Sequence, residues 1–591
     1  MKHRTKTLIA LILAVLLILS ACGKQVDPPL VQTPETPQPL ILSVALGDAQ
    51  DTLVPTYSTA AGSETILYHL YENLLRWEDD GNGYAVLAPG QAESYTVETD
   101  YAGNATYTFT LRNDIVWSDG QSVTSYQFAA AWQRLADPAY NSPHRELFSC
   151  IAGYDEVQAT GDPSLLQVST PDARTLVVKL VGSVPCFLEV VCAGAYTMPI
   201  RTYLPGNMDN QIVTNGAYYL AEFSDGLVKL AKSENYYDRA NVTVDEIHII
   251  PASDSETDYV KLSEGTIDFT GALPVSALQE LAVGSWVSEP VTVTYALLLN
   301  TMQYPFDNAD VRAAFRLAVD EQAIVNALAD YTSRAATGLV PYGVNDHGVE
   351  RASEEDEDQT ASADPNVPAP EQEEKAPYAD FRAHSREIVT MDISEDYDID
   401  CTWARALLSG AGFADGKDFP QVEYIYVDTP ENKLVAECLR STWQNILGVT
   451  VTLRGLTEEE YAQMLQPSGE GAASGEETLY PAFQIAATEL TCDYTDAYDF
   501  LARWHSASAE NICGYSSPAF DILIGAAAAA TAPESFDAYL HDAEAILLQD
   551  SPVIPLFYRG GSYALSDDLT GLYRAPNGIY FFSHITRSVE E

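Results

Sequence analysis

Several groups of residues in this 591-residue chain have the types, but not the full spacing, that phosphate or metal binding requires. Residues 410–418 contain three glycines and Lys417, but they lack the glycine spacing of a phosphate loop and the Ser or Thr that follows its lysine. Residues 392–398 alternate as a calcium loop does, but Tyr397 stands at the glycine position and Trp403 stands where a bidentate Glu is needed. The sequence also has no G-x-S-x-G nucleophile elbow and no H-E-x-x-H pair. We therefore expect no enzyme activity, no metal site and no cofactor.

The eight cysteines form no C-x-x-C pair and no Cys/His spacing that suits zinc. If Cys22 is modified, seven remain, so at least one of them is free or intermolecular. Cys186 and Cys192 are close enough in sequence to form a local disulfide. Buried free thiols are the favoured alternative.

The charge of the chain excludes several classes of partner. There are 85 acidic and 31 basic residues, which give a formal charge of −54. A nucleic-acid-binding protein needs a basic face, and no basic cluster exists here, so we expect no nucleic-acid partner. Docking of the folded body on anionic lipid is disfavoured for the same reason.

The first 21 residues are typical of an export signal. Lys2, Arg4 and Lys6 precede an apolar run over 8–19, which is too short to span a membrane. The run ends in Leu19-Ser20-Ala21-Cys22, which resembles the lipobox of bacterial lipoproteins, in which the cysteine thiol receives lipid. The alternative is an ordinary secretory signal with a chance cysteine. Cleavage before Cys22 would remove three bases and no acids, and would take the charge from −54 to −57.

Periodicity in the body predicts both strands and helices. Residues 107–111 and 175–180 alternate as strands do, and Thr124 with Gln127 forms a capping box at the start of a helix. A second helix is expected from Asn308 through Gln322, with one apolar face. Residues 422–453 are typical of a βαβ unit, with Pro430 at the helix start and Gly448 at its end.

Two segments are expected to lie outside the folded core. Residues 23–39 contain five prolines and are typical of an extended tether. The segment Glu350–Lys375 has ten acids, two bases and no aromatic residue, so it cannot bury enough apolar surface to order itself. We interpret it as a disordered acidic insertion on the surface; a loop that binds cations or a partner is the alternative.

The order of these segments resembles the family 5 solute-binding lipoproteins of oligopeptide and dipeptide ABC importers. The most characteristic segments are Tyr71-Glu72-Asn73-Leu74, Trp117-Ser118-Asp119-Gly120 and Val213–Tyr218. Further similar segments occur, in the same order as in the family, at 52–55, 107–112, 128–135, 300–320, 514–518 and 554–556. Each motif is weak alone, but together they extend over about residues 42–575.

The resemblance implies an α/β fold of the periplasmic-binding-protein type (class II, cluster C). Two lobes are joined by a hinge, and an extra subdomain lies on the N-terminal lobe. The expected boundaries are a signal peptide at 1–21, a tether at 22–39, lobe I at 40–72, 193–292 and 561–591, the subdomain at 73–192, and lobe II at 293–560 with the insertion at 346–377.

The resemblance also implies the ligand-binding residues. Asp493 stands where the family has an acid that receives the peptide ammonium, although Leu490 replaces the family's tryptophan. A cap of a helix or turn is the alternative role for Asp493. Glu489 would favour cationic ligands if it faces the cleft, and Thr491 lies between these residues. On the opposite lobe, Thr59, Ala60 and Ala61 match an extended segment that pairs with the peptide main chain, or they form a plain surface loop. We interpret Trp117 and Tyr218 as packing residues rather than ligand contacts.

The expected function is capture of oligopeptides between two lobes and their delivery to the membrane subunits of an ABC permease. The protein would be a monomer, held by its lipid at the extracytoplasmic face of the bacterial cell membrane. A peptide signal receptor, or a binder of a nickel chelate, a sugar or another small solute, is the alternative. A hydrolase with scattered catalytic residues is less favoured.

Overall fold

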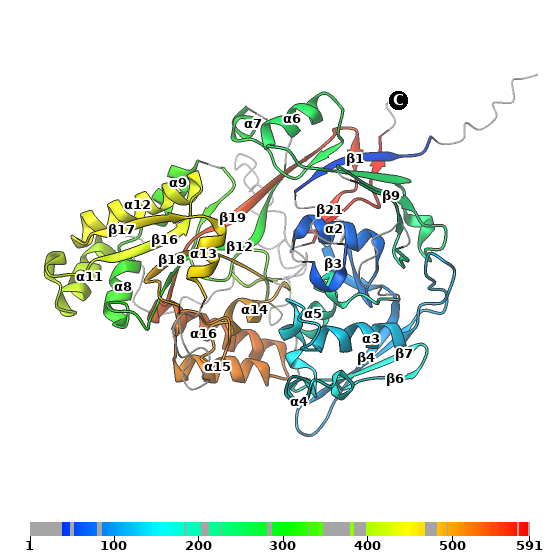
Figure 1. The fold of residues 1–591 in the computed structure, drawn as a ribbon, viewed down its shortest axis with the longest axis horizontal. Helices are drawn as coiled ribbons and strands as arrows, with labels where there is room; N and C mark the ends of the chain where they lie inside the picture. The colour runs from blue at the N-terminus through cyan, green and yellow to red at the C-terminus, as the bar shows by residue number, and fades with distance from the viewer. Residues whose placement is uncertain are drawn as a thin grey trace, which may run out of the picture. The chain divides into compact units, whose positions relative to one another are not determined.

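The longest strands of the computed structural model are β12 (Val287–Leu299) and β19 (Val553–Leu565), which run side by side (Figure 1). The structure describes residues 38–47, 53–58, 60–79, 85–182, 184, 186–201, 212–224, 226–280, 287–329, 331–346, 379–382, 397–466, 481–492, 494–575 and 578–588. Within Leu40–Glu591, one continuous sheet passes through both strands. Its order in the described residues is β17-β16-β18-β12-β19-β11-β1-β10-β9-β8, with the short strand β13 also on β19. We call the strands from β17 to β19 the C-terminal half-sheet and those from β11 to β8 the N-terminal half-sheet.

The C-terminal half-sheet is apolar on both faces because its strands are covered on both sides. Along β12, Tyr295, Leu297 and Leu299 belong to one core, whereas Ala296 and Leu298 belong to the other, as the period of two requires. The first core includes helices α8, α9, α11 and α12, and the second includes α14, α15 and α16. The remaining elements of this half are β13 (Arg334–Ala335), β16 (Val422–Val427), β17 (Val451–Leu456), β18 (Ile485–Thr491), α8 (Ala309–Leu317), α9 (Glu321–Leu328), α11 (Tyr397–Gly410), α12 (Pro430–Leu447), α13 (Glu458–Met464), α14 (Ala497–Ala502), α15 (Pro518–Ala528) and α16 (Pro533–Asp550).

The predicted βαβ unit is confirmed. Strands β16 and β17 are parallel, and α12 begins at Pro430 behind the N-cap Thr429. Gly448 ends the helix with a φ of 71°, a left-handed conformation that glycine adopts without the steric cost other residues meet. The second strand runs over 451–456 rather than the expected 449–453.

The single helix expected from Asn308 through Gln322 is wrong: the structure has two helices. Asn308 does cap α8, because its side chain accepts the Asp310 N–H over 2.8 Å. However, α8 ends at Leu317, and Asp320 caps a new helix, α9, by accepting the Ala323 N–H over 2.8 Å. An aspartate that captures backbone N–H groups in this way competes with helix continuation, which the apolar periodicity alone did not show.

The N-terminal half-sheet and a separate four-stranded sheet, ordered β4-β5-β7-β6, share one core. The elements of this half are β1 (Ile41–Leu46), β2 (Leu75–Asp79), β3 (Ala85–Pro89), β4 (Ala92–Thr99), β5 (Ala105–Leu111), β6 (Val168–Asp172), β7 (Thr175–Lys179), β8 (Tyr218–Ser224), β9 (Leu227–Lys232), β10 (Glu246–Pro251), β11 (Phe269–Thr270), α2 (Ala61–Leu70), α3 (Ser125–Ala136), α4 (Tyr154–Thr160), α5 (Phe187–Ala193), α6 (Ser255–Ser263) and α7 (Val275–Glu280). The predicted capping box at the start of α3 is confirmed, since the Thr124 N–H donates to the Gln127 side chain over 2.8 Å. Trp117 and Tyr218 are buried in this core, in agreement with a packing role.

Two of the sequence motifs through which the chain resembles the family, at 71–74 and 213–218, contact each other. The Asn215 side chain accepts the Glu72 N–H over 3.2 Å and donates to the Glu72 carbonyl oxygen over 3.0 Å. A Cβ atom on Gly216 would lie 2.7 to 2.8 Å from backbone atoms of residues 69–71, so only glycine permits this approach. These motif residues therefore hold the chain in place and are not exposed for ligand binding.

The C-terminal segment returns to the N-terminal half through four short strands, β20 (Leu569–Thr570), β21 (Tyr573–Arg574), β22 (Tyr580–Phe581) and β23 (Thr586–Arg587). His69, in the last turn of α2, is buried beside it. Its Nδ1–H donates to the Thr65 carbonyl oxygen over 2.7 Å, and its Nε2 accepts the Phe582 N–H over 3.1 Å. Burial lowers the pKa of His69 to about 4. The neutral imidazole thus ties α2 to the C-terminal segment, and a proton on Nε2 would remove one of its two bonds.

Cys186 is a free, buried thiol, so the local disulfide with Cys192 is excluded.

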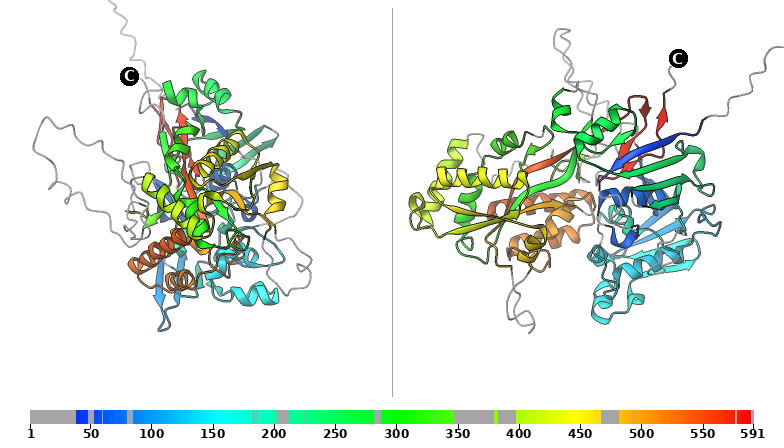
Figure 2. Two further views of the ribbon diagram at one scale, coloured as in Figure 1. Left: turned by 90° about the vertical axis from the view of Figure 1, so that its left-hand side faces the viewer. Right: turned by 45° about the horizontal axis from the view of Figure 1, so that its top comes forward.

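In the part of the chain that the structure describes, no helix is long and apolar enough to span a membrane. The signal peptide at 1–21, Cys22 and nearly all of the tether lie outside the described residues, and so does the acidic insertion apart from Asp346. The two views in Figure 2 show β12 and β19 adjacent from other directions.

His69 should make the stability of the protein sensitive to acid. Its pKa in the folded state is about 4, below the ordinary value of 6.5, so the unfolded chain takes up the proton first as the pH falls. Above pH 6.5, the contribution of this histidine to the free energy of unfolding is complete. The contribution is lost as the pH falls toward about 4, and about 2 kcal/mol of it has been lost at pH 5. Urea unfolding of the wild type and of His69→Gln between pH 7 and 5 should therefore show a smaller pH dependence in the variant. An unchanged slope in His69→Gln would contradict this role.

Candidate functional site

The parallel strands of the C-terminal half-sheet end at one edge, which we call the carboxyl edge. Strand β16 is parallel to both β17 and β18, so Val427, Leu456 and Thr491 end together at this edge. Ligands of open α/β sheets bind outside the carboxyl ends of the strands, because the loops that follow can diverge there. The sequence-predicted residues Glu489, Leu490 and Thr491 occupy the end of β18, so this edge is the candidate site.

The structure separates the three described residues that were predicted on β18. Glu489 and Thr491 are exposed, whereas Leu490 is only 6% exposed and packs in the core with α14 and α15. The period of two of a strand requires this division. Leu490 thus packs in a core on the face of β18 opposite Glu489, and its role as a ligand contact stays a prediction.

Asp493 and Thr59 lie outside the described residues, so their ligand roles stay predictions. Ala60 is extended, but Ala61 is the first residue of α2. The extended segment predicted at 59–61 therefore ends at Ala60. The N–H groups in the first turn of a helix have no partner within that helix, so the ligand role of Ala61 stays a prediction.

Arg559 is a site residue that sequence reasoning missed. Position 559 lies on β19, two residues after Phe557, and its guanidinium carbon lies 5.6 Å from the Tyr295 ring centroid and 5.3 Å from that of Phe557. Its Nε donates to the Glu489 carboxylate over 3.0 Å, and its Nη1 lies 2.6 Å from the carboxylate of Glu431. No local signal could have found this cluster, because its members come from α12, β18 and β19.

The backbone register explains how the cluster forms. Tyr295 of β12 lies directly opposite Glu489 on one neighbouring strand and opposite Phe557 on the other. The Tyr295 hydroxyl donates to the Asn432 side chain over 2.9 Å, which ties the first turn of α12 to the sheet. Burial lowers the pKa of the Arg559 guanidinium, but the nearby Glu489 and Glu431 more than compensate and raise it, so Arg559 stays charged.

The loop after β18 is held in place by Tyr494 and Asp496. Tyr494 packs in the core with Phe500 of α14, and Asp496 caps α14 by accepting the Tyr498 N–H over 2.6 Å. The cap of this helix is therefore Asp496 and not Asp493. Asn345 forms a backbone bridge with Asp496.

This bridge connects the loop to the two ends of the acidic insertion. Strands β14 (Asn345–Asp346) and β15 (Ala379–Asp380) pair there, and we call the pair together with Phe381 and Arg382 the clasp. Phe381 stacks on His541 of α16 with 3.8 Å between ring centroids. The buried Arg382 donates to the Val340 carbonyl oxygen over 2.8 Å and pairs with Glu544 of α16. The clasp is thus anchored on α16 and supports the loop that contains Asp493.

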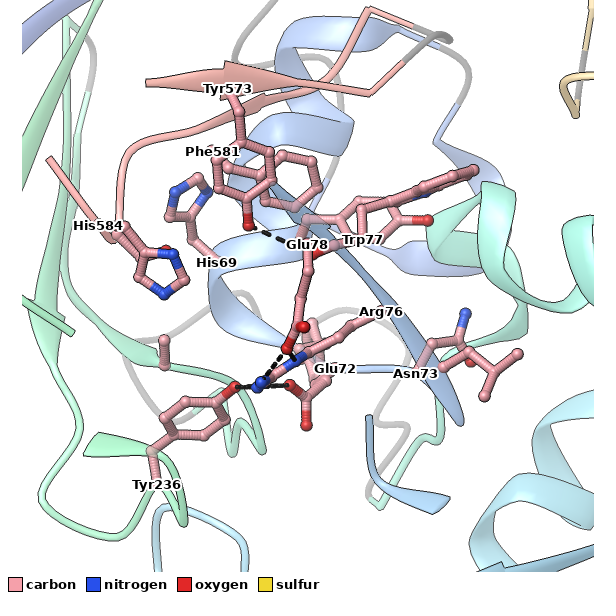
Figure 3. Close-up of a pocket in the computed structure, with 15 residues that line it drawn as sticks. His69, Glu72, Asn73, Arg76, Trp77, Glu78, Tyr236, Tyr573, Phe581 and His584 are labelled. Atoms are coloured by element: carbon pink, nitrogen blue, oxygen red, sulfur yellow. Dashed lines mark hydrogen bonds and ion pairs between the residues drawn. The ribbon is translucent and has the colours of Figure 1, made fainter. Parts of the chain in front are cut away.

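A second candidate lies within the N-terminal half, where a cavity of about 50 Å³ is lined by His69, Glu72, Arg76, Trp77, Tyr236 and His584, among others (Figure 3). Here Glu72 is buried and accepts hydrogen bonds from the Tyr236 hydroxyl over 2.5 Å and from the Gln91 amide over 2.7 Å. Arg76 lies 3.5 Å from the same carboxylate and 3.0 Å from Asp238. A cavity of this size holds a few water molecules and no peptide.

Burial raises the pKa of the Glu72 carboxyl, against the opposing effects of Arg76 and of the Tyr236 and Tyr237 hydroxyls, which both donate to it. A buried carboxylate with this many partners is a structural network, since each lost partner would leave a desolvated charge. The cavity therefore belongs to the packing of the N-terminal half, and the carboxyl edge remains the candidate for ligand binding.

Comparisons with known proteins agree with the two-lobed fold that the sequence predicts. Residues 86–511 match the model of "Bacterial extracellular solute-binding proteins, family 5 Middle". The chain is 27% identical over 530 residues to the periplasmic oligopeptide-binding protein OppA of Escherichia coli, which covers 87% of this chain and 86% of that protein. It is 26% identical over 502 residues to the dipeptide-binding protein DppE of Bacillus subtilis, which covers 83% of this chain and 82% of that protein.

A solved structure has the same two-lobed periplasmic-binding fold. The crystal structure of Haemophilus influenzae OppA in complex with the peptide RPPGFSPFR superimposes with a TM-score of 0.69 at 21% identity. The superposition covers 93% of this chain and 99% of that one. Since the family model covers most of the chain, this protein belongs to family 5 of the bacterial extracellular solute-binding proteins.

Proposed function

We propose that this protein binds oligopeptides at the extracytoplasmic face of a bacterial membrane and delivers them to an ABC permease. The observation that carries the proposal is the family match over residues 86–511. The relatives named above for dipeptide and oligopeptide binding support peptides as the ligand class. Family 5 comprises solute-binding proteins rather than enzymes, which agrees with the absence of catalytic motifs from the sequence.

In this proposal, the peptide lies between the two lobes against the carboxyl edge. Asp493 would receive the peptide ammonium through a charge-assisted hydrogen bond, and Tyr494 and Asp496 would hold the loop in place for it. Thr59, Ala60 and Ala61 would present main-chain groups from the other lobe, as in strand addition. Contacts with both lobes stabilise a closed form, and that differential stabilisation is what a hinge receptor requires.

Attachment through lipid on Cys22 completes the proposal. The apolar run and the small residues before Cys22 support it, and the prolines that follow would separate the folded body from the membrane. Tethering raises the local concentration of the receptor near its permease. A monomer is sufficient for this role.

Ligand that co-purifies with the protein should consist of peptides. Native mass spectrometry of the exported protein, followed by denaturation and sequencing of the released ligand, should identify peptides in stoichiometric amounts. The closed form retains its ligand because both lobes contact it. Recovery of a sugar, a metal chelate or a sterol-like molecule in place of peptide would contradict the ligand class.

Substitution of Asp493 should weaken binding of peptides that have a free amino terminus. A hydrogen bond to a charged group contributes about 1.5–3 kcal/mol, so Asp493→Ala should lose about 10- to 100-fold in affinity, as measured by isothermal titration calorimetry. The N-acetylated peptide is the control: the wild type and the variant should bind it with similar affinity. Equal affinity of the two proteins for the free-amine peptide would show that Asp493 is not the anchor.

Substitution of Cys22 should release the protein from the membrane. The wild type should incorporate labelled palmitate and partition into detergent, because acyl chains on the cysteine transfer favourably into apolar phases. Cys22→Ser should do neither, whereas Cys150→Ser, which alters a thiol of the folded body, should behave as the wild type does. Label in Cys22→Ser would place the lipid elsewhere.

A further inference from the structure

The cluster of Glu431, Glu489 and Arg559 lies at the carboxyl edge where the proposed ligand binds. Glu431 is in the first turn of α12, Glu489 is near the end of β18, and Arg559 is on β19. Neither of the two carboxylates is required for the fold of its own element. Thr429 is the N-cap of α12, and the backbone ladder with β12 holds β18 in place. The sheet therefore brings together three charges that no single element needs.

The cluster has one more negative than positive charge. The Glu489 and Glu431 side chains are 46% and 39% exposed, whereas Arg559 is 24% exposed. The guanidinium packs against the stacked rings of Tyr295 and Phe557, and its N–H groups pair with the two carboxylates. Solvent at this edge thus meets carboxylate oxygens more than guanidinium nitrogens.

Acceptor capacity remains after Arg559 is bound. Both contacts of Arg559 with Glu489 use the same oxygen, Oε1. Within the described residues, Oε2 of Glu489 has no hydrogen-bond partner, and an ionised carboxylate can accept bonds on both oxygens. The two carboxylates are held near each other because Arg559 lies between them, so a second cation approaching from solvent meets a preorganised pair.

We propose that Glu489 and Glu431, held in place by Arg559, select ligands that carry a basic side chain. This inference rests on the proposed function, since it requires a peptide at the carboxyl edge. The group recognised is an ammonium or guanidinium on a ligand side chain, in addition to the terminal ammonium assigned to Asp493. Arg559 is a positioning residue that sets the spacing of the two carboxylates.

The test uses pairs of tetrapeptides. The two members of a pair are identical except at one position, which holds lysine in one peptide and norleucine in the other. There is one pair for each of the four positions. Norleucine keeps the length of the aliphatic chain and removes the charge. By calorimetry, the wild type should prefer lysine at one position by about two- to fivefold, the range of an exposed ion pair. That preference should fall as sodium chloride is raised from about 50 mM to about 500 mM.

Glu489→Gln should remove most of this preference, measured as the ratio of the affinities for the lysine and norleucine peptides. Glu431→Gln is a second variant that tests the same pair if the first is unstable. The matched control is Glu423→Gln, because Glu423 is also a half-exposed glutamate paired with an arginine, Arg454, over 3.4 Å, but it lies at the opposite end of β16. This control should keep the lysine preference.

The outcomes separate the two proposals. If the peptides bind but lysine and norleucine are equivalent at every position, the charge selectivity is overturned and peptide binding stands. The same holds if both glutamine variants keep the full preference. If none of the peptides binds while the protein is folded, the proposed function fails and this inference fails with it.

Discussion

The pairing of β12 with β19 is the constraint on which the rest of the C-terminal half depends. Each strand is 13 residues long, and each must present apolar side chains to two separate cores. The ladder is interrupted between Pro290 and Thr294 of β12, opposite Arg559. Directly after Arg559, a side chain on Gly560 would meet the Thr332 carbonyl oxygen at 2.1 Å, so a glycine is required there. The irregularity places Arg559 over the aromatic rings at the carboxyl edge. The position of the charge cluster thus follows from the register of two strands.

Buried polar networks hold the N-terminal half together. Glu72 has tyrosine, glutamine and arginine partners, and His69 has two backbone partners from separate segments. Both residues lie in or beside a motif that resembles the family, yet neither lies at the candidate ligand edge. Residues that recur in a family motif can serve packing, because a buried polar group without its partners is costly. Ligand selectivity can then vary at other positions without loss of the fold.

The surplus of negative charge affects the site in two ways. Over the whole surface, 85 acids against 31 bases favour the approach of cationic solutes through long-range electrostatics, which salt weakens. At the carboxyl edge, however, one carboxylate charge is neutralised by Arg559, so the local charge is smaller than the sequence alone indicates. The expectation that Glu489 favours cationic ligands was made without knowledge of this partner. Its selectivity depends on the pair of carboxylates and the arginine together.

The sequence alone determined the features whose signals are local. Thr124 with Gln127 marks the start of α3, and Pro430 and Gly448 bound α12, because caps act on backbone groups within one turn. The family order of motifs also predicted the two-lobed fold of a solute-binding protein. The break between α8 and α9 was missed because the apolar pattern continued through it, although Asp320 was visible as a cap.

Only the tertiary structure decided which side chains meet. Leu490 and Glu489 are adjacent in sequence, but the pleat of β18 buries the first and exposes the second. Glu489 and Arg559 are 70 residues apart, and their contact requires β12 to lie between their strands. The clasp likewise joins residues on either side of a long insertion to α16. Sequence reasoning could not predict these contacts, because sheet order and register result from the burial of both faces at once and not from any local segment.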